Sequence, residues 1–340
     1  MFLIPLTAVR ARVDSGVQRI FWWLSLVLLT LLIGFRFEVG GDWGAYLIHF
    51  NNILRFSFSE VLTRGDPAYY MINWLVADAG WSIEWVNLVC ALMVVVGVNA
   101  FCREQPLPWL ALLVAIPYLI IVVSMGYTRQ AAALGLVLVG LKALGRHETR
   151  KFIFWVMLGA LFHKSAVILL PIAALAAMQR RIWTFVWVAI VSIVGAYILV
   201  YQEVDDLWLN YVSQEYAFAS QGATIRVMMN AVPSVLLLLF RKRIFYDRVE
   251  RRLWLWLAVF SLACIVGLSY SPTAIDRLAL YFIPVQLFAF SRLPFLTKNR
   301  GVFNLIIVAV VVYYALVMFV WLNYATHARF WLPYDNYIFS

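Results

Sequence analysis

The sequence predicts an all-α protein that crosses a membrane about eleven times, with one further re-entrant or interfacial helix near residues 67–80. Of its 340 residues, 64% are hydrophobic and only 13% are charged, which is too few polar groups to cover a water-soluble protein of this size. Several apolar segments are about 17–22 residues long, which is the length that crosses ~30 Å of hydrocarbon as a helix. The alternating pattern of a membrane β-barrel does not occur.

Each spanning helix is predicted from an apolar run that is bounded by polar or turn-forming residues. The expected spans cover residues 20–35, 82–101, 107–124, 128–145, 150–163, 165–179, 183–201, 223–240, 253–269, 275–291 and 302–322. The segment 67–80 is apolar but short, and it contains Asn73 and Asp78. We therefore expect this segment to lie at the interface or to re-enter the membrane.

The distribution of charge orients these helices. With the N-terminus inside and every expected span crossing, the inner segments carry a net charge of +14 and the outer segments −4, which together give the +10 of the chain. A crossing by residues 67–80 would place the basic loops 142–151 and 241–252 outside, against the positive-inside tendency. The prediction is an N-in and C-out topology with about eleven crossings.

The run from residue 150 to 178 is interrupted by His163, Lys164 and Ser165. A single crossing here would invert everything downstream and place the basic loop 241–252 outside. We expect two short helices that meet at a polar apex, an arrangement that membrane proteins tolerate where it lines a watery cavity.

The rest of the chain indicates a single membrane domain over residues 1–340, with a cytoplasmic lead at 1–19 and outer loops at 36–81 and 202–222. The lead is basic, and no small-residue cleavage site follows the apolar run, so we expect a retained first helix. The three cysteines lie in or beside apolar segments without a CxxC pair, which predicts no metal site. Basic residues in short clusters between apolar runs are typical of topology determinants, and we expect no nucleic-acid partner.

The first candidate cluster follows the first helix on the outer side. Arg36 offers a planar fork to phosphate oxygens, Asp42 supplies a carboxylate, and Gly40-Gly41 allows close approach of a ligand to the backbone. A turn held by an Arg–Asp pair would explain the same residues.

The second cluster begins the helix expected at residues 128–145. Arg129 lies where free N–H groups already favour an anion, and Gln130 follows it. An arginine in this position can also simply reach the lipid headgroups.

The third cluster is the polar apex itself. Ionisable residues such as His163 and Lys164 are costly inside a membrane unless they are paired or hydrated, so they indicate a functional site. The imidazole of His163 is a candidate general base. A histidine that caps a helix is the structural alternative.

Two further clusters lie on later helices. Asp276 and Arg277 precede Tyr281, which lies one helical turn after Arg277 on the same face. Arg226 follows an acidic loop, which also fits a solvated cap. An internal Asp–Arg ion pair would explain Asp276 and Arg277 equally well.

The chain resembles the EpsG/Wzy-type exopolysaccharide polymerases over nearly its whole length. The resemblance rests on five segments in the same order: Arg36, Gly41, Asp42 and Tyr46; Arg129-Gln130 before Ala131, Ala132 and Ala133; Phe162, His163, Ser165 and Pro171; Arg277, Tyr281 and Phe282; and Pro333-Tyr334. Gly40-Gly41 departs from the family pattern, in which a small polar residue usually stands before the aspartate.

This resemblance implies a glycosyltransferase of the bacterial inner membrane whose active site faces the periplasm. A growing glycan would pass from an undecaprenyl-diphosphate carrier to a lipid-linked repeat unit, without metal or nucleotide cofactor. The implied partners are the lipid-linked oligosaccharide, the bilayer, a chain-length regulator and a flippase.

For such a reaction, the sequence supplies several residues with suitable chemistry. Arginines would hold the diphosphate, and either His163 or Asp42 would take the proton of the acceptor hydroxyl. The full candidate set is catalytic His163 and Asp42, with substrate contacts from Arg36, Tyr46, Arg129, Gln130, Lys164, Arg226, Asp276, Arg277 and Tyr281.

Three other functions remain compatible with the same sequence. A glycan ligase of the O-antigen type would share the arginines, but such enzymes usually have a longer, basic outer loop than the acidic one at 202–222. A flippase or transporter would spread charge through the depth of the membrane, whereas this chain concentrates its charge at one face. A scaffold subunit of a polysaccharide machine is the third.

Overall fold

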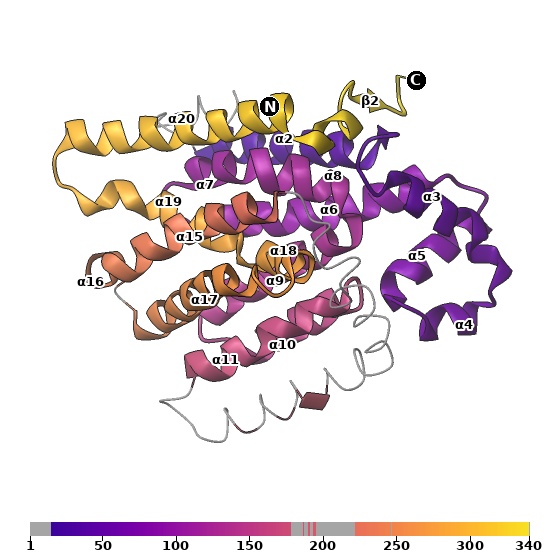
Figure 1. The fold of residues 1–340 in the computed structure, drawn as a ribbon, viewed down its shortest axis with the longest axis horizontal. Helices are drawn as coiled ribbons and strands as arrows, with labels where there is room; N and C mark the ends of the chain where they lie inside the picture. Colours follow the sequence, from indigo (N-terminus) through magenta and orange to yellow (C-terminus); the bar gives the residue numbers. More distant parts are fainter. Residues whose placement is uncertain are drawn as a thin grey trace.

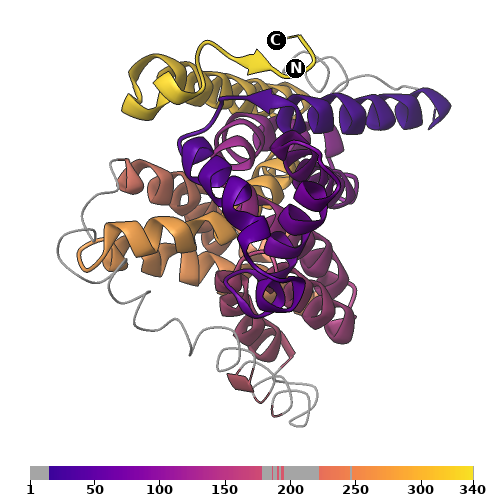
Figure 2. The same cartoon turned by 90° about the vertical axis from the view of Figure 1, so that its right-hand side faces the viewer.

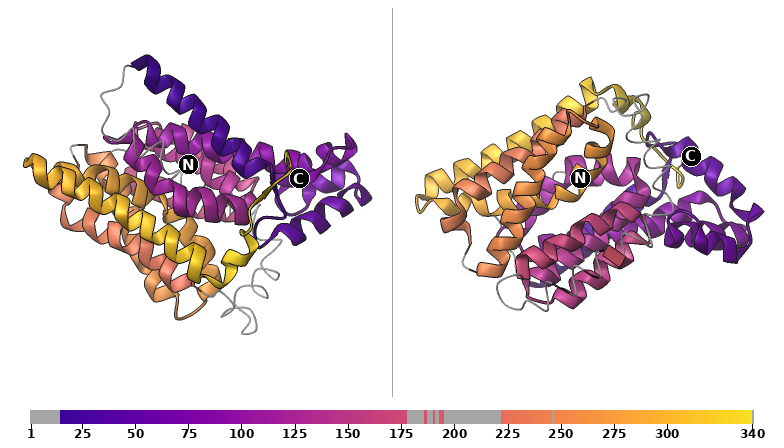
Figure 3. Two further views of the ribbon diagram at one scale, coloured as in Figure 1. Left: turned by 90° about the horizontal axis from the view of Figure 1, so that it is seen from above. Right: turned by 60° about the horizontal axis from the view of Figure 1, so that its bottom comes forward.

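The computed structural model describes residues 15–177, 222–245 and 247–339, together with residues 186, 190, 193 and 194. The predicted helix at 183–201, the acidic outer loop and most of the cytoplasmic lead lie outside these residues. The described chain folds into helices that run along one long axis, with α2 and α20 on one side and α10 and α11 on the opposite side (Figure 1). Figure 3 (left) shows that α2 and α20 lie apart from each other on that side.

The first half of the chain contains the short helices α3 to α5 and the helices at the centre of the bundle. Its elements are α2 (Ser15–Gly34), β1 (Arg36–Phe37), α3 (Trp43–Asn52), η1 (Ile53–Arg55), α4 (Phe58–Thr63), α5 (Pro67–Asp78), α6 (Ile83–Cys102), α7 (Pro108–Ala115), η2 (Ile116–Val123), α8 (Ser124–Gly126), α9 (Thr128–Gly145), α10 (Thr149–Ala160), η3 (Lys164–Leu169) and α11 (Leu170–Ala177).

The second half adds helices on one side of the bundle and returns to the start of the chain. Its elements are α15 (Ala223–Leu239), α16 (Arg241–Ile244), α17 (Arg248–Gly267), α18 (Pro272–Ala279), η5 (Leu280–Phe282), α19 (Pro284–Arg292), η6 (Leu293–Leu296), α20 (Arg300–Tyr324), η7 (Thr326–Phe330) and β2 (Asp335–Asn336). The two short strands β1 and β2 pair antiparallel.

Among the described residues, four helices are long and apolar enough to span a membrane: Gly16–Gly34, Ile83–Cys102, Pro108–Gly126 and Arg300–Tyr324. A fifth span results if Pro272–Phe282 and Pro284–Leu296, bent by 45°, count as one crossing. The protein is therefore an all-helical, multi-pass membrane protein. The break expected at His163 is present, because α10 ends at Ala160 and the chain continues as the 3-10 helix η3 from Lys164.

The ion pairs of the described residues form two separate groups. At one end, Glu104 pairs with Lys142 and Arg146, and Glu250 pairs with Arg292 at 3.0 Å. The ion pairs Arg129–Asp66, Arg226–Asp276 and Arg277–Asp42 share no residue with this set. In Figure 1, the basic helix α16 lies at one end of the bundle and the short helices α3 to α5 lie at the other end.

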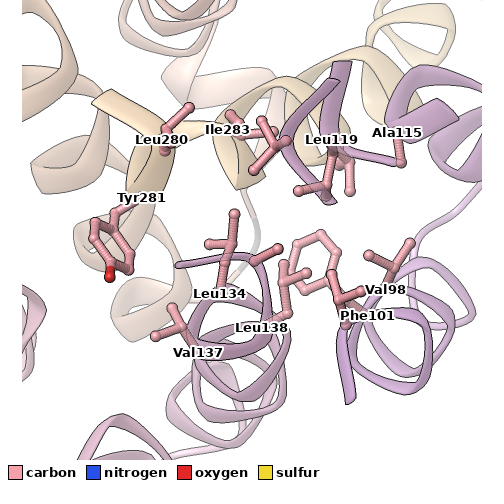
Figure 4. Packing of buried hydrophobic residues seen from close by; sticks show 14 of the residues in the cluster. Val98, Phe101, Ala115, Leu119, Leu134, Val137, Leu138, Leu280, Tyr281 and Ile283 are labelled. Atoms are coloured by element: carbon pink, nitrogen blue, oxygen red, sulfur yellow. The ribbon is translucent and has the colours of Figure 1, made fainter. Parts of the chain in front are cut away.

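The core forms where α6, α7 with η2, α9 and η5 meet (Figure 4). The buried residues drawn there include Val98 and Phe101 from α6, Leu119 from η2, and Leu134 and Leu138 from α9. Large and branched side chains interdigitate along these faces, and this packing holds the bundle together where lipid offers no hydrophobic driving force between helices.

The closest helix contact joins α6 to α9 through two glycines. A Cβ atom on Gly97 would lie 2.0 Å from the backbone oxygen of Gly135, and one on Gly135 would lie 2.5 Å from Cα of Val94. Small residues at such crossings let the backbones approach closely.

The Gly135→Ala variant is therefore expected to lose about 1–3 kcal/mol of stability through overpacking. The measurement is the thermal unfolding midpoint in detergent. Gly145→Ala in the same helix is the matched control, because no heavy atom lies within 4 Å of its added Cβ. Equal midpoints for the two variants would contradict the proposed close crossing.

A fully bonded polar network joins the later helices. Asn230 of α15 donates to the Ala279 carbonyl at 2.8 Å, Gln286 of α19 donates to Asn230 Oδ1 at 2.6 Å, and Tyr314 of α20 donates to Gln286 Oε1 at 2.6 Å. Each bond satisfies a buried polar group where no water competes. The network fixes α15 against α18 one turn from Arg226 and close to Asp276.

Candidate functional site

Asp66 is the centre of a polar cluster at the end of the bundle where α3 to α5 lie. Its Oδ2 atom lies 2.9 Å from Arg129 Nη1 and 3.4 Å from His163 Nδ1, and its Oδ1 atom accepts the backbone N–H of Lys164 at 3.1 Å. The carboxylate is only 6% exposed. One buried carboxylate therefore joins the start of α9 to the break between α10 and η3.

Local sequence places this carboxylate. Asp66 stands immediately before α5, with Pro67 at the first helical turn, where a proline is well tolerated. Its side chain makes no capping bond to the helix. The Ala68 N–H instead donates to the Leu161 carbonyl at 2.9 Å, which fastens the start of α5 to the end of α10 and directs the carboxylate to His163.

Arg129 is held between two aromatic rings. Its guanidinium carbon lies 5.8 Å from the ring centroids of both Tyr46 and Tyr69, within the range of a cation–π contact. The side chain keeps 36% of its surface exposed. Asp66 occupies Nη1, so the remaining N–H donors of this planar group can serve an anionic ligand.

The polar apex brings His163 and Lys164 to Asp66 and carries a second contact beside them. His163 is 18% exposed, and Lys164 contacts Asp66 through its backbone N–H. Ser165 lies 3.1 Å from the hydroxyl of Tyr281, which is completely buried. Tyr281 therefore lies beneath the cluster, although the sequence suggested a contact with substrate.

A second group of residues adjoins the first. Arg277 Nη2 lies 3.9 Å from Asp42 Oδ2, and its guanidinium carbon lies 4.5 Å from the ring centroid of Tyr127. Gln130 donates to the backbone carbonyl of Arg277 at 2.6 Å and is buried. Arg277 and Asp42 keep 31% and 38% of their side-chain surfaces exposed, so both remain accessible to a ligand.

Arg226 and Asp276 form a bidentate ion pair in which Nε and Nη2 of the arginine donate to the two carboxylate oxygens. Their side chains are 16% and 8% exposed. This pair joins α15 to α18, so Asp276 pairs with Arg226, whereas the ion-pair alternative from the sequence paired it with Arg277. Neither group has the exposure of Arg129 or Arg277.

The sequence suggested that Arg36 is open to a phosphate ligand, but this residue is buried in the protein. It is 1% exposed, and it donates to the carbonyls of Ile33 and Val39 and to the side chains of Asn87 and Thr128. These four bonds engage the guanidinium within the protein. Arg36 therefore fastens the chain after α2 to α6 and to the first residue of α9.

The two carboxylates differ in their electrostatics. Burial favours the neutral form of Asp66, but the hydrogen bond from His163 and the charges of His163 and Arg129 outweigh it and hold its pKa below the ordinary value. Burial raises the pKa of Asp42, and the charges of Arg277, Arg129 and His327 only partly oppose this shift. Asp66 thus stays a stable anion, whereas ionised Asp42 is costly to the fold.

The raised pKa of Asp42 predicts a pH-dependent gain in stability on its replacement. Ionised Asp42 costs stability above its folded-state pKa, and the cost disappears as the pH falls through that value toward its ordinary one near 3.8. Asp42→Asn is therefore expected to unfold at a higher temperature than wild type at pH 7, with the difference shrinking on acidification. The exposed residue Asp78, changed to asparagine, is the control. A lower midpoint for Asp42→Asn at pH 7 would contradict this assignment.

The structure thus brings together most of the predicted site residues, namely Asp42, Tyr46, Arg129, Gln130, His163, Lys164, Arg277 and Tyr281, around Asp66. Sequence reasoning did not identify Asp66 or Tyr69. The available signal was the Asp-Pro start of the short helix at 67–80, where an aspartate is ordinarily read as a cap. Its partners lie 63 and 97 residues further along the chain.

Among the described residues, no group of three or more His, Cys, Asp and Glu side chains is arranged to hold a metal ion. The described residues of the site offer arginines for an anion, the carboxylates of Asp66 and Asp42, and the imidazole of His163.

Comparison with known proteins gives one match. The model of the EpsG family matches residues 19–336, which is nearly the whole chain. No curated protein and no solved structure matches the sequence.

Proposed function

The chain belongs to the EpsG family, and from this membership we propose that it polymerises a polysaccharide from lipid-linked units at the outer face of the bacterial inner membrane. The family makes it a multi-pass membrane protein of the polysaccharide polymerase type. The donor in our proposal is a growing glycan on undecaprenyl diphosphate, and the acceptor is a fresh lipid-linked repeat unit.

We propose an N-in and C-out topology with about eleven crossings for a single membrane domain over residues 1–340. The separation of the ion pairs into two ends supports it, because the basic segments at α16 and α9–α10 lie away from the Asp66 cluster. The positive-inside tendency assigns the α16 end to the cytoplasm. The Asp66 cluster then faces the periplasm.

The cationic side chains suit the departing diphosphate. In the proposed step, the acceptor hydroxyl oxygen attacks the anomeric carbon of the donor glycan, and the bond from that carbon to the phosphate oxygen breaks. The electron pair leaves with the lipid diphosphate, so negative charge grows on its oxygen. Arg129 and Arg277 are the exposed arginines of the site, and we assign this charge to them.

His163 is the proposed base. Its Nδ1 faces Asp66, which selects the tautomer that donates from Nδ1 and leaves Nε2 to take the hydroxyl proton. Asp66 also stabilises the imidazolium that forms, so its role is to position and support His163. Asp42 is the alternative base, and its contact with Arg277 fits better with holding that arginine.

The remaining candidates act as supports in this proposal. Gln130 holds the backbone of Arg277, Tyr281 holds Ser165 beneath His163, and Arg36 and the Arg226–Asp276 pair fix the surrounding helices. Tyr46 flanks Arg129 and is the residue placed to contact a sugar. Lys164 lies beside the diphosphate-binding arginines.

Only one diphosphate needs to bind at this centre. The acceptor's own diphosphate is separated from its reacting hydroxyl by a whole repeat unit, so it stays at a distance from the anomeric carbon under attack. One compact group of arginines therefore suffices. A chain-length regulator and a flippase remain proposed partners.

The observation that carries this function is the joining of Arg129 and His163 by buried Asp66, in a chain that the family matches from residue 19 to 336. The test is reconstitution of the purified protein in proteoliposomes with one lipid-diphosphate-linked repeat unit. Polymerisation predicts longer lipid-linked glycans and the release of one free polyprenyl diphosphate for each glycosidic bond that forms.

Three other results would each overturn the proposal. Movement of the unit across the bilayer without elongation indicates a flippase, and transfer only to an added lipid A core acceptor indicates a ligase. The absence of all three reactions indicates a scaffold subunit.

A further inference from the structure

The C-terminal segment returns to the start of the chain. After α20, residues 326–339 run back to the outer end, where β2 pairs with β1 so that Asn336 faces Arg36 and Asp335 faces Phe37. The Tyr337 N–H donates to the Phe35 carbonyl at 2.8 Å, and the Gly40 N–H donates to the Phe330 carbonyl at 2.8 Å. Figure 2 shows this strand beside the end of α2. We call residues 326–339 the C-terminal strap.

Trp331 is the buried anchor of the strap. It is 5% exposed, and its indole N–H donates to the Ile121 carbonyl at 2.9 Å. A Cβ atom on Gly126 would lie 2.7 Å from its ring, and the Cβ of Gly41 would lie 4.0 Å from it. The ring thus packs closely against the turn at Gly126 and lies near the loop at Gly41, which is far from that turn in sequence.

Those two turns also touch each other. Gly40 has a φ of +114°, and a Cβ atom there would lie 2.3 Å from the backbone oxygen of Met125. Only glycine fits this combination of left-handed backbone and close approach. The loop at 40–41 therefore rests directly on the turn at 125–126, with Trp331 against both.

Each turn leads into a residue of the site. Asp42 follows Gly41 and Tyr127 follows Gly126, and Arg277 contacts both, at 3.9 Å to Asp42 and 4.5 Å to the Tyr127 ring. A shift of either turn would separate the groups that hold this arginine. The relative position of Asp42 and Tyr127 therefore depends on what holds these two touching turns in place.

We infer that Trp331 and the C-terminal strap are positioning elements of the polymerase site, because Trp331 sets the two turns that hold Arg277. This inference rests on the proposed function. It assigns a role to a segment that contributes no side chain to the proposed chemistry.

The first test measures turnover in proteoliposomes. Trp331→Ala is expected to lower kcat about tenfold to 100-fold, since a displacement of about 1 Å in a catalytic group costs that much. KM should change less than about threefold, because Arg129 still binds the diphosphate. Trp331→Phe keeps an aromatic ring beside the two turns and should recover most of kcat. Phe339→Ala in the same strap is the control, because Phe339 is 87% exposed.

A second variant guards against misfolding of Trp331→Ala. Gly126→Ala does not change the tryptophan itself but adds a methyl group 2.7 Å from its ring. This variant should therefore displace the ring and lower kcat in the same way. Activities are normalised to folded protein. A purely structural role would lower the unfolding temperature and leave kcat of the folded fraction unchanged.

The final experiment does not depend on activity. Spin labels at Gly44→Cys in α3 and Ile168→Cys in η3 report the distance between the loop that carries Asp42 and the polar apex. No atom lies within 4 Å of a Cβ at Gly44, Ile168 is 49% exposed, and the native cysteines are buried. The distance distribution should broaden in Trp331→Ala and Gly126→Ala but not in Phe339→Ala.

The results separate the two proposals. If wild type fails to elongate glycans but the distribution broadens as expected, the proposed function fails while the strap retains its positioning role. If wild type is active and either the distribution or kcat is unchanged in both Trp331→Ala and Gly126→Ala, the strap inference is overturned.

Discussion

Replacing Asp66 by asparagine is expected to reduce glycan elongation by about 100-fold or more, which is the scale of a lost general base. Asparagine is similar in size and can still accept the Lys164 N–H, so the start of α5 should remain in place. It carries no charge, however, and can neither pair with Arg129 nor stabilise a protonated His163. The measurement is the length and amount of lipid-linked glycan in proteoliposomes.

The control for this prediction is Asp78→Asn, at the other end of the same short helix. Asp78 is exposed and lies at the last position of α5, so this variant should keep wild-type elongation. Asp66→Asn with more than about a third of wild-type activity would remove Asp66 from the mechanism.

A double mutant separates a supporting role from an independent one. His163→Gln removes the proposed base but keeps a hydrogen-bonding side chain. If Asp66 acts through His163, adding Asp66→Asn to His163→Gln should cost much less than Asp66→Asn costs alone. Full activity of His163→Gln would exclude His163 as the base and leave Asp42 as the candidate.

Arg129→Ala and Arg277→Ala are each expected to abolish long-chain product while the proteins still insert into the membrane at normal levels. Each change removes a planar cation that we assign to the leaving diphosphate. Loss of one such preorganised group typically costs about 100-fold to 1000-fold in turnover. Arg277→Lys should recover only part of the activity, because an ammonium group cannot bind phosphate oxygens through the same fork.

Stability distinguishes the two arginines. Arg129→Ala leaves the buried carboxylate of Asp66 without its 2.9 Å partner, so its unfolding temperature should fall. Arg277→Ala removes a 3.9 Å contact with Asp42 and the contact with the Tyr127 ring, both made by a partly exposed side chain, so its unfolding temperature should fall less than that of Arg129→Ala. The control is Arg150→Ala, an exposed arginine at the start of α10. Normal chain length in both arginine variants would refute the assignment of the diphosphate site.

Hydropathy predicted most helices because the need to satisfy every backbone group in lipid leaves few alternatives to a helix. Among the described residues, α6, α9, α17 and α20 coincide with predicted spans to within a few residues. The part of the chain that the structure describes contains four or five clear spans, so the count of about eleven remains part of our proposal. The span predicted at 107–124 corresponds to the continuous helix Pro108–Gly126, whose middle is the π-helix η2. The bent pair at 272–296 was predicted as one helix at 275–291, because hydropathy does not detect a bend.

The candidate site was predictable in composition but not in its roles. Asp42, Arg129, His163 and Arg277 were identified because charges at the ends of apolar runs are costly unless they serve a purpose. Arg36 had the same local appearance, yet it is fully buried and bonded within the protein. Exposure separates these arginines, and exposure depends on helices that are distant in the sequence.

The sequence by itself determined that this is a membrane protein and that its family is EpsG. It also indicated that the charged residues at the ends of apolar runs lie at one end of the protein. These conclusions follow from local properties: the apolar length of each segment, the sign of each loop and short motifs in order. Only the tertiary structure decided that Asp66 joins Arg129 to His163, that Arg36 is a support, and that Trp331 and the C-terminal strap pack against the loop of Asp42. The long-range contacts among these link residues 51 to about 300 positions apart, and their formation depends on helix packing that no local pattern encodes.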